Sequence, residues 1–428
     1  MTAERKEKGL LGDISRTLTG NLVFAAAQWF IIIVVARLGS PEQVGYVTLA
    51  AAIVTPIFAL TGLSLRDARS VDVRGGHSDH DYMLLRIMMN TTAVLLSGVV
   101  ILGFYGDRPG AVVFAALGLV LTKVPHTQSL LHYGIAQTRG RFDVIVTSQV
   151  LRGLLGVMCF GVVFAFTGSV GAGFVAQSIC WAVVLILAER RPLARDGVAF
   201  GLGRIDLPKV RRALALMVWM LPLAIAGVLQ VVSLYVPRLV LAEYVSFEAL
   251  GLFGAIYYFL TAIQTVIRSI SQASVSRMAK AEASGNRSRF WRITGIVLAA
   301  NAVLGLFIIA GAYAVGEWVV AAVYGAAYVD LFLILMVAVT AALQLIMGVT
   351  QYTMLASHHF WLRMWVNGIC LVAAIGLSFL FIPASGVTGA AWVILWVSVI
   401  RLVLGLAVLG WSMTRPSTPQ SGDADATP

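Results

Sequence analysis

The sequence predicts an all-α polytopic membrane protein with about twelve transmembrane helices, and two observations carry that prediction. Of the 428 residues, 59% are hydrophobic and only 12% are charged, whereas about a quarter of the residues in an ordinary soluble domain are charged. The apolar residues also fall into stretches of about 20, the length of helix that crosses the hydrocarbon core of a bilayer. These features exclude a disordered chain, a disulfide-rich secreted domain and most soluble enzymes.

Twelve apolar stretches are expected to span the membrane, six in each half of the chain. In the first half they are residues 18–36, 44–65, 84–104, 111–133, 144–166 and 170–188. In the second half they are residues 213–234, 247–267, 292–314, 331–354, 364–382 and 386–411. Residues 315–330 are expected to form a partial or interfacial helix. The first stretch follows a basic start but has no convincing cleavage site, so it is expected to be retained.

The connections between these stretches differ in their basic residues. The connections that lead from an odd to an even span carry Arg37, Arg108 and Arg238, whereas the opposite connections and the termini carry 25 Lys and Arg. Basic loops stay in the cytoplasm, so both termini are expected to be cytoplasmic. The net charge of +11 is thus explained mainly by topology, and no nucleic-acid partner is needed to account for it.

The two halves of the chain repeat each other. Residues 37–46 contain Arg-Leu, a turn with an acidic residue, and a Gly that opens the second span, and residues 238–253 repeat this order. Residues 168–174 and 386–392 open the sixth and twelfth spans with similar small residues. Because each half has an even number of spans, the halves are expected to form a parallel repeat about an axis along the membrane normal.

Two six-helix bundles around a central cavity are the expected architecture, which is typical of a transporter. The expected domains are residues 1–188 for the N-terminal half, 189–212 for a basic cytoplasmic linker, 213–411 for the C-terminal half and 412–428 for a disordered cytoplasmic tail.

Five groups of residues carry a resemblance to a known family. They are residues 36–46, residues 238–241 with 250–253, residues 276–286, residues 324–325, and residues 382–383 followed by 386–391. At these positions the chain resembles the O-antigen and polysaccharide flippases of the multidrug/oligosaccharidyl-lipid/polysaccharide (MOP) exporter superfamily, and the resemblance covers most of residues 16–411. One departure is Pro237, where the family often has an acidic residue.

The resemblance implies a bacterial inner-membrane protein that takes part in the biosynthesis of O-antigen, capsule or exopolysaccharide. Such a protein moves an undecaprenyl-pyrophosphate-linked oligosaccharide from the cytoplasmic to the periplasmic leaflet. Its expected partners are this anionic glycolipid, the lipid bilayer and the polysaccharide polymerase machinery. No cofactor, metal site or catalytic group is expected, because the sequence contains none of the common metal or nucleophile motifs.

Three basic residues lie well inside the predicted spans. Lys123, Arg152 and Arg401 have no acidic residue at their depth, because every Asp and Glu falls in a loop, a tail or a helix end. Ionisable groups at membrane depth are costly and usually functional, and Lys and Arg together suit a pyrophosphate. These three residues are therefore candidate substrate ligands. The alternative is that each side chain extends to the headgroups, and for Arg401 the two interpretations are equally good.

Polar side chains at helical spacing add further candidates for substrate binding. They are Gln28, His126, Tyr257, Gln264, Gln344 and Gln351. A sugar chain needs many donors and acceptors, although the same side chains also bond neighbouring helices in packed bundles. His126 is interpreted as the only His inside a span, which makes it a candidate for proton linkage.

Three other functions compete with the flippase. An ion-coupled multidrug or metabolite exporter of the same superfamily is the main alternative, but cation export usually needs an intramembrane carboxylate. A polymerase or glycosyltransferase needs a large outer loop with catalytic groups, and the outer connections here are short. A scaffold without transport would not need buried cations.

Overall fold

The computed structural model describes residues 3–63, 65–66, 69, 78–198, 200, 206–258, 287–356 and 360–414. This part of the chain is helical and contains no strand. Nine of its helices are long and apolar enough to cross a membrane: Thr19–Leu38, Pro41–Gly62, Asp79–Tyr105, Gly110–Thr138, Phe142–Thr167, Val170–Arg195, Ser288–Val323, Leu331–Thr350 and Leu362–Gly410. The predicted all-α, multi-pass class is confirmed.

The first half of the chain supplies six long helical segments. They are α1 (Ala3–Leu38), α2 (Pro41–Gly62), α4 (Asp79–Tyr105), α5 (Gly110–Thr138), α6 (Phe142–Thr167) and α7 (Val170–Val184), the last continued by a π-helical turn η1 (Leu185–Arg190) and by α8 (Arg191–Arg195). Short connections with side-chain caps fix their starts. Ser40 caps α2 by accepting a hydrogen bond from the backbone N–H of Gln43, whose side chain in turn accepts one from Ser40, a reciprocal arrangement that satisfies two backbone donors.

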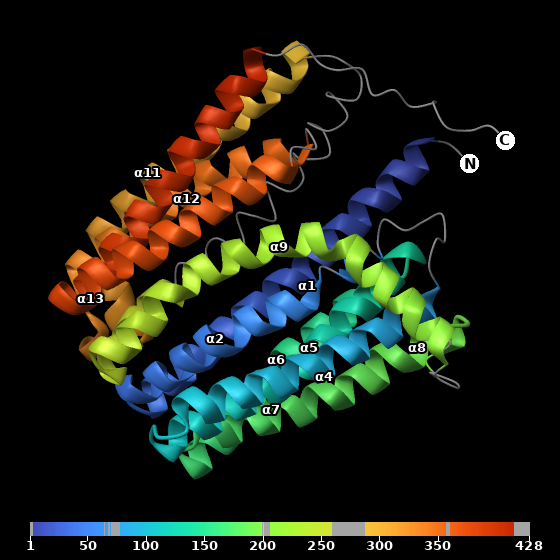
Figure 1. Ribbon diagram of the computed structural model, residues 1–428, viewed down its shortest axis with the longest axis horizontal. Coiled ribbons are helices and arrows are strands. Elements are labelled where there is room, and N and C mark those ends of the chain that lie inside the picture. The colour runs from blue at the N-terminus through green and yellow to red at the C-terminus, as the bar shows by residue number, and fades with distance from the viewer. Residues whose placement is uncertain are drawn as a thin grey trace.

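The second half contains α9 (Leu207–Tyr244), a helix at Phe247–Tyr258, α11 (Arg287–Val323), a 3-10 turn η2 (Ala326–Tyr328), α12 (Leu331–Ala356) and α13 (Phe360–Thr414). The long α13 is two helices that meet at Gly386, where φ is 55° and ψ is −126°. These two helices match the predicted spans 364–382 and 386–411. In Figure 1, α11, α12 and α13 lie together on one side, α4 to α8 lie on the other, and α1, α2 and α9 lie between them.

Three sequence expectations need correction. Residues 315–330 do not form a separate partial helix, because α11 runs unbroken to Val323 and only Ala326–Tyr328 make a turn. Arg86, which is one of the 25 basic residues assigned to the connections and termini, and Arg238 both lie in helices, α4 and α9, and each is only 2% exposed. The basic side chains there are buried because neighbouring carbonyls or aromatic rings surround them.

The repeat is visible in the backbone. Gly168 and Gly386 precede the sixth and last spans and both have positive φ, 62° and 55°, a conformation that Gly adopts without strain. Gly45 and Gly251 meet across the two halves, and a Cβ on either would overlap the carbonyl oxygen of the residue four positions before the other, Phe247 and Pro41 respectively. The halves therefore touch through repeated glycines, which allow close helix approach.

Other contacts between the halves gather at the same end of the bundle, where α1 ends and α2 begins; we call it the joined end. Arg37 donates hydrogen bonds to the carbonyls of Ala321 and Ala322 and, at 2.9 Å, of Val323, at the end of α11. Arg108 pairs with Glu243. These contacts hold the two halves together at this end, because each joins a residue of one half to a residue of the other.

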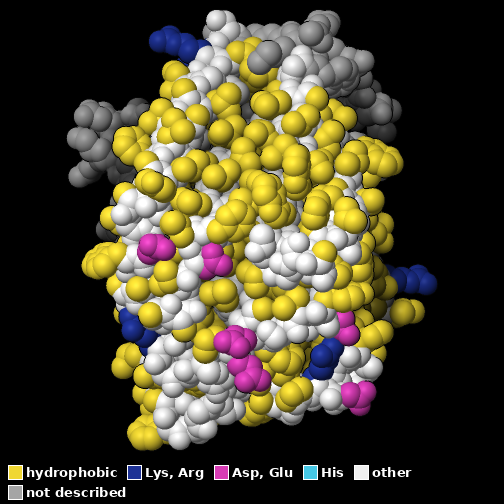
Figure 2. Space-filling model, turned by 90° about the vertical axis from the view of Figure 1, so that its left-hand side faces the viewer, with side chains coloured by type: hydrophobic (Ala, Val, Ile, Leu, Met, Phe, Trp, Pro, Cys, Tyr) yellow, Lys and Arg dark blue, Asp and Glu magenta, His cyan; other side chains and the backbone are white. Residues whose placement is uncertain are grey.

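The outside of the bundle is apolar. Phe104, Phe166, Trp318 and Val372 are more than two-thirds exposed. Hydrophobic side chains cover most of the face in Figure 2, where acidic and basic side chains gather toward the lower part. Exposed apolar surface of this extent marks contact with lipid.

Candidate functional site

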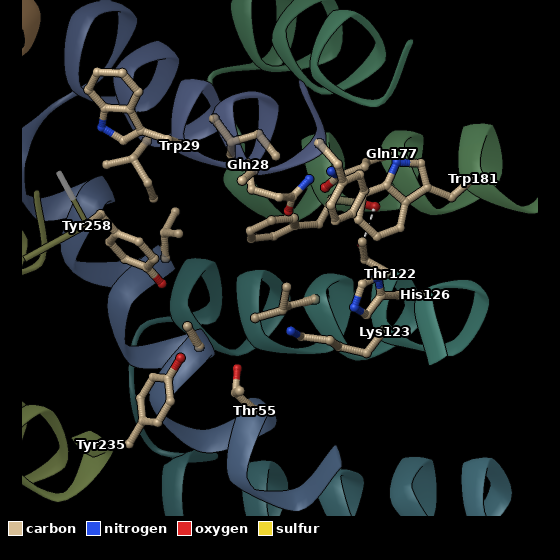
Figure 3. A pocket seen from close by; sticks show the side chains of 18 residues that line it. Gln28, Trp29, Thr55, Thr122, Lys123, His126, Gln177, Trp181, Tyr235 and Tyr258 are labelled. Carbon is tan, nitrogen blue, oxygen red and sulfur yellow. Dashed lines mark hydrogen bonds between the residues drawn. The ribbon is translucent and has the colours of Figure 1, made fainter. Parts of the chain in front are cut away.

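A cavity of about 350 Å³ lies among α1, α2, α5 and α7. Tyr235 of α9 and Tyr258 of the following helix complete its wall, so that both halves contribute. Ten of the side chains around it are labelled in Figure 3: Gln28, Trp29, Thr55, Thr122, Lys123, His126, Gln177, Trp181, Tyr235 and Tyr258. Apolar residues make up the rest. A mainly apolar pocket with a few convergent polar groups is typical of a ligand site.

Lys123 is the one Lys or Arg among the residues that line this cavity, and Asp and Glu are absent from the lining. Its side chain extends from α5 into the cavity, toward the side where Thr55 and Tyr235 lie (Figure 3). Within the described residues, Lys123 forms no ion pair. An amine placed in this way is available to an anionic ligand.

Two glutamine side chains at the cavity have atoms without partners. Gln177 is 1% exposed, and neither its amide nitrogen nor its amide oxygen has a hydrogen-bond partner in the described structure. The amide nitrogen of Gln28 also has no hydrogen-bond partner in the described structure. Both residues line the cavity. Buried amides are costly when unpaired, so these atoms are placed for a ligand that both donates and accepts hydrogen bonds.

Arg152 lies behind the cavity wall. It is 1% exposed, and its Nη2 lies 3.0 Å from Nδ1 of the cavity residue His126. Its guanidinium carbon stands 4.3 Å from the ring centre of Trp181, a cation–π contact that offsets part of the cost of burial. The predicted pair of Lys123 and Arg152 is thus brought to one site, but only Lys123 lines the cavity.

A buried carboxylate, which sequence reasoning missed, is linked to Arg152. The hydroxyl of Tyr133 accepts from Arg152 at 3.2 Å and lies 2.9 Å from Ser148 Oγ, which donates to Glu189 at 2.5 Å. Glu189 is 0% exposed. The sequence places every Asp and Glu in a loop, a tail or a helix end, and it gives no sign that one of them is linked to Arg152. Glu189 stands at a helix end along the sequence, and the π-helical turn places its side chain inside the bundle.

The expectation that His126 is the only His inside a span is also wrong. His132 lies inside α5 with 1% exposure, and its Nδ1 is 2.8 Å from Glu189. His132 falls within the predicted span 111–133, so its place inside a span follows from the sequence, whereas its contact with Glu189 does not. Gln177 and Trp181, four residues apart in an apolar run, could have been found by the spacing that places them on one helical face.

The remaining candidates lie away from the cavity lining. Arg401 of α13 is 2% exposed and donates to Ser233 Oγ at 2.6 Å, and Gln344 donates to Ser398 at 3.4 Å. Tyr257 lies under the guanidinium of Arg238. Gln264 and the side chain of Gln351 lie outside the described residues.

Arg238 is enclosed by aromatic rings from its own helix α9 and from the helix Phe247–Tyr258 that follows it. Its guanidinium carbon lies 4.6, 4.4 and 5.6 Å from the ring centres of Tyr235, Tyr257 and Tyr258. Two of these rings, Tyr235 and Tyr258, also line the cavity. The cavity wall in the second half is therefore aromatic and is backed by a positive charge.

The described residues contain no group of three or more His, Cys, Asp or Glu that could hold a metal ion. What the cavity offers is the Lys123 cation, two glutamine amides, four Thr and Tyr hydroxyls, and the rings of six Phe, Trp and Tyr residues. Such a set binds and orients a polar anionic ligand by charge, hydrogen bonds and ring stacking.

The fold of the chain is similar to that of solved membrane transporters. An inward-facing multidrug-resistance MATE transporter of the MOP superfamily superimposes with a TM-score of 0.71 over 96% of both chains, at 13% identity. The eukaryotic MATE transporter AtDTX14 also gives 0.71, over 96% of this chain and 97% of its own, at 12% identity. The chain therefore has the MATE-type fold of two helical bundles, and the fold that the resemblance implies is confirmed.

The chain is also similar in sequence to a protein that is named for polysaccharide biosynthesis. The chain is 22% identical over 387 residues to the capsular polysaccharide biosynthesis protein CapF of Staphylococcus aureus, which covers 89% of this chain and 94% of the relative. No protein-family model matches the sequence.

Proposed function

We propose that this protein flips a lipid-linked anionic oligosaccharide, carried on undecaprenyl pyrophosphate, from the cytoplasmic to the periplasmic leaflet of the inner membrane. Both termini face the cytoplasm, residues 1–188 and 213–411 form the two moving halves, and a polysaccharide polymerase receives the product. The name of the CapF relative, a capsular polysaccharide biosynthesis protein, supports a role in polysaccharide biosynthesis.

The observation that carries the proposal is the charge of the cavity. Lys123 faces it, Arg152 stands behind it, and its lining has no carboxylate. A cavity of this sign favours phosphate over a cationic drug, because an ammonium ligand would meet only like charge. The sugar would use the amide nitrogen of Gln28 and both amide atoms of Gln177, which have no hydrogen-bond partner among the described residues.

A multidrug exporter is the second candidate, since solved structures with this fold include multidrug-resistance MATE transporters. Expression in a drug-sensitive host separates the two functions. An exporter raises the resistance of the host to cationic dyes, whereas a glycolipid flippase leaves the resistance unchanged.

The direct test replaces Lys123 in a polysaccharide-producing host that depends on this protein. We expect Lys123→Ala to lower surface polymer about tenfold to a hundredfold, because a charge-assisted hydrogen bond contributes about 1.5–3 kcal/mol. Lys123→Arg should retain part of the output. The measurements are surface sugar analysis and an immunoblot of protein level.

Arg211→Ala is the matched control. Arg211 is exposed near the start of α9 and is not among the cavity residues, so its replacement removes the same charge without changing the cavity. Purified protein provides a second measurement: a polyprenyl-pyrophosphoryl sugar should change the fluorescence of Trp29 and Trp181, which line the cavity. Normal polymer output from Lys123→Ala at normal protein level would exclude Lys123 from the mechanism.

A further inference from the structure

Glu189 is a carboxylate sealed inside the bundle. It is 0% exposed, and its two oxygens take different partners: Oε2 lies 2.8 Å from His132 Nδ1, and Oε1 accepts from Ser148 Oγ. It sits in the π-helical turn η1, and such turns are frequent at functional sites. A carboxylate at this depth needs a positive or hydrogen-bonded partner to remain charged.

His132 occupies a defined hydrogen-bonding position beside it. Its Nε2 lies 3.2 Å from the amide nitrogen of Gln128, which can only donate. When this amide nitrogen donates to Nε2, Nδ1 is the ring nitrogen that donates to Glu189. A second proton at Nε2 requires Gln128 to turn its carbonyl toward the ring. Phe200 packs edge-on against the imidazole at 5.1 Å between ring centres and covers it.

A directed chain of hydrogen bonds joins this pair to the cavity. Arg152 donates to Tyr133, and Ser148 donates to Glu189; the hydroxyl of Tyr133 therefore has its own hydrogen to give to Ser148 at 2.9 Å. Arg152 also donates to Nδ1 of His126, a residue that lines the cavity. The charge of Glu189 is thus connected to the wall of the ligand site by two hydroxyls and one guanidinium.

The groups around the pair are mostly cationic. The titratable and charged residues on the packed elements are His126, Lys123 and Tyr133 on α5, Arg152 on α6, Arg190 on η1, Arg86 on α4, and Arg66, whose guanidinium lies over Tyr133. Glu189 is the carboxylate of this network, whereas Asp81, the other buried carboxylate of the described residues, lies in the first turn of α4 and bonds with Ser78 and Arg212. The charge of Glu189 therefore offsets Arg152, and a proton on the pair would remove that offset.

We propose that the His132–Glu189 pair is a proton-binding site and that its proton changes the charge at the cavity wall. When the pair holds a proton, Glu189 is neutralised locally and Arg152 acts on the cavity uncompensated. An anionic ligand is then bound more tightly, by about threefold to tenfold. Because coupling between two sites is reciprocal, binding of the anion draws a proton onto the pair.

The first test needs no ligand and uses His126 as the reporter. In purified protein with ¹⁵N-labelled histidine, nitrogen NMR follows the ring signals from about pH 8 to pH 5, the range in which His titrates. The signal of His126 should shift with the titration of His132. In Ser148→Ala, which interrupts the chain, His132 should still titrate while His126 no longer follows it.

His80→Gln is the matched control, because it removes a histidine at the start of α4 and should leave the response of His126 intact. His132→Gln should abolish that response. A His126 signal that stays constant over this range, or that still shifts in His132→Gln, overturns the proposal. Should His132→Gln not fold, Ser148→Ala decides the question alone.

The second test measures the effect on the ligand and rests on the proposed function. Binding of a polyprenyl-pyrophosphoryl sugar, whose two phosphates keep their charge over this range, is followed by tryptophan fluorescence at pH 8 and pH 5. Affinity should rise about threefold to tenfold at the lower pH in the unmodified protein and stay level in His132→Gln. Level binding in both overturns the coupling alone. Absence of binding at every pH overturns the proposed function, and the NMR titration then decides the proton site.

Discussion

The two ends of the bundle are held together in different ways. At the joined end, the contacts cross between the halves: Gly45 packs on Phe247, Arg37 caps α11, and Trp29 donates to Tyr324 at 2.6 Å. At the opposite end, the polar contacts of the described residues lie mostly within the first half, as in the network of Glu189.

Among the described residues, the bond from Arg212 to Asp81 crosses between the halves at the opposite end; it is long, 3.4 Å, and Arg212 is 59% exposed. Different contacts therefore close the joined end of the bundle and stabilise the interior of the first half. The joined end is closed by shape, through backbones in contact. The opposite end is stabilised by the buried polar network inside the first half and by an apolar cluster that Leu216 and Met220 of α9 share with Leu85 of α4.

The largest effect should come from the internal network. Glu189→Ala leaves Arg152 without its carboxylate, and breaking a buried ionic network typically costs about 3–5 kcal/mol. We expect a marked fall in thermal stability, measured by unfolding in mild detergent. The exposed Glu248→Ala should stay within about 0.5 kcal/mol of the unmodified protein. Equal stability of the two variants would mean that Glu189 does not hold this end together.

The glycine contact at the joined end should come next. Gly45→Ala inserts a methyl group where the carbonyl of Phe247 already lies, and overpacking of this kind costs about 1–3 kcal/mol. Gly251→Ala should have a similar effect, because its surroundings mirror those of Gly45. Stability in detergent and the reactivity of a cysteine introduced at this end are the measurements, since forced separation should expose the contact.

Gly62→Ala is the control on the same helix. No atom outside its own helix lies within 4 Å of a Cβ at that position, so alanine is expected to be neutral or slightly stabilising. If Gly62→Ala and Gly45→Ala behaved alike, helix propensity and not the contact between the halves would explain the result.

Arg37→Ala should have a smaller effect. The side chain is exposed and its partners are carbonyls at the end of α11, where a positive charge contributes roughly 0.3–1 kcal/mol. The loss should weaken closure of the joined end and raise cysteine reactivity there. Arg37→Lys keeps the charge, so its cysteine reactivity should lie between that of the unmodified protein and that of Arg37→Ala. An unchanged reactivity in Arg37→Ala would show that the glycine contact alone closes this end.

The smallest effect is expected at an exposed ion-pair cluster of the opposite end. Arg141 pairs with Asp143 at 2.9 Å and also with Asp196. Exposed pairs contribute about 0.2–1 kcal/mol, and salt screens them. Arg141→Ala should therefore lower stability slightly at low ionic strength and not in about 1 M salt. Arg191→Ala, at an exposed arginine without an ion pair in the described structure, is the comparison.

Much of the fold follows from the sequence because the bilayer allows few solutions. A stretch of about 20 apolar residues has to be helical, since its backbone groups find no water. The ends of helices were harder. α11 continues to Val323 past the exposed Glu317, and an acidic residue at such a place in the sequence resembles the start of a loop.

The candidate site was only partly predictable. Lys123 and Gln28 stood out because polar groups are rare in apolar runs, and both line the cavity. Glu189 and His132 did not, because each lies near the end of an apolar run and their burial is produced by tertiary packing. Arg238 was assigned to a loop for the same reason, although three rings surround it.

The contact of Gly45 with Gly251 has a further consequence. Each glycine meets the residue four positions before the other, so the same surface is presented on both sides. In an assembly of identical chains, such a self-complementary contact is the isologous interface of a two-fold dimer. The single chain thus joins its halves as a dimer of six-helix subunits would. A substitution at Gly45 therefore has a structural counterpart at Gly251, where the same change meets the same surroundings.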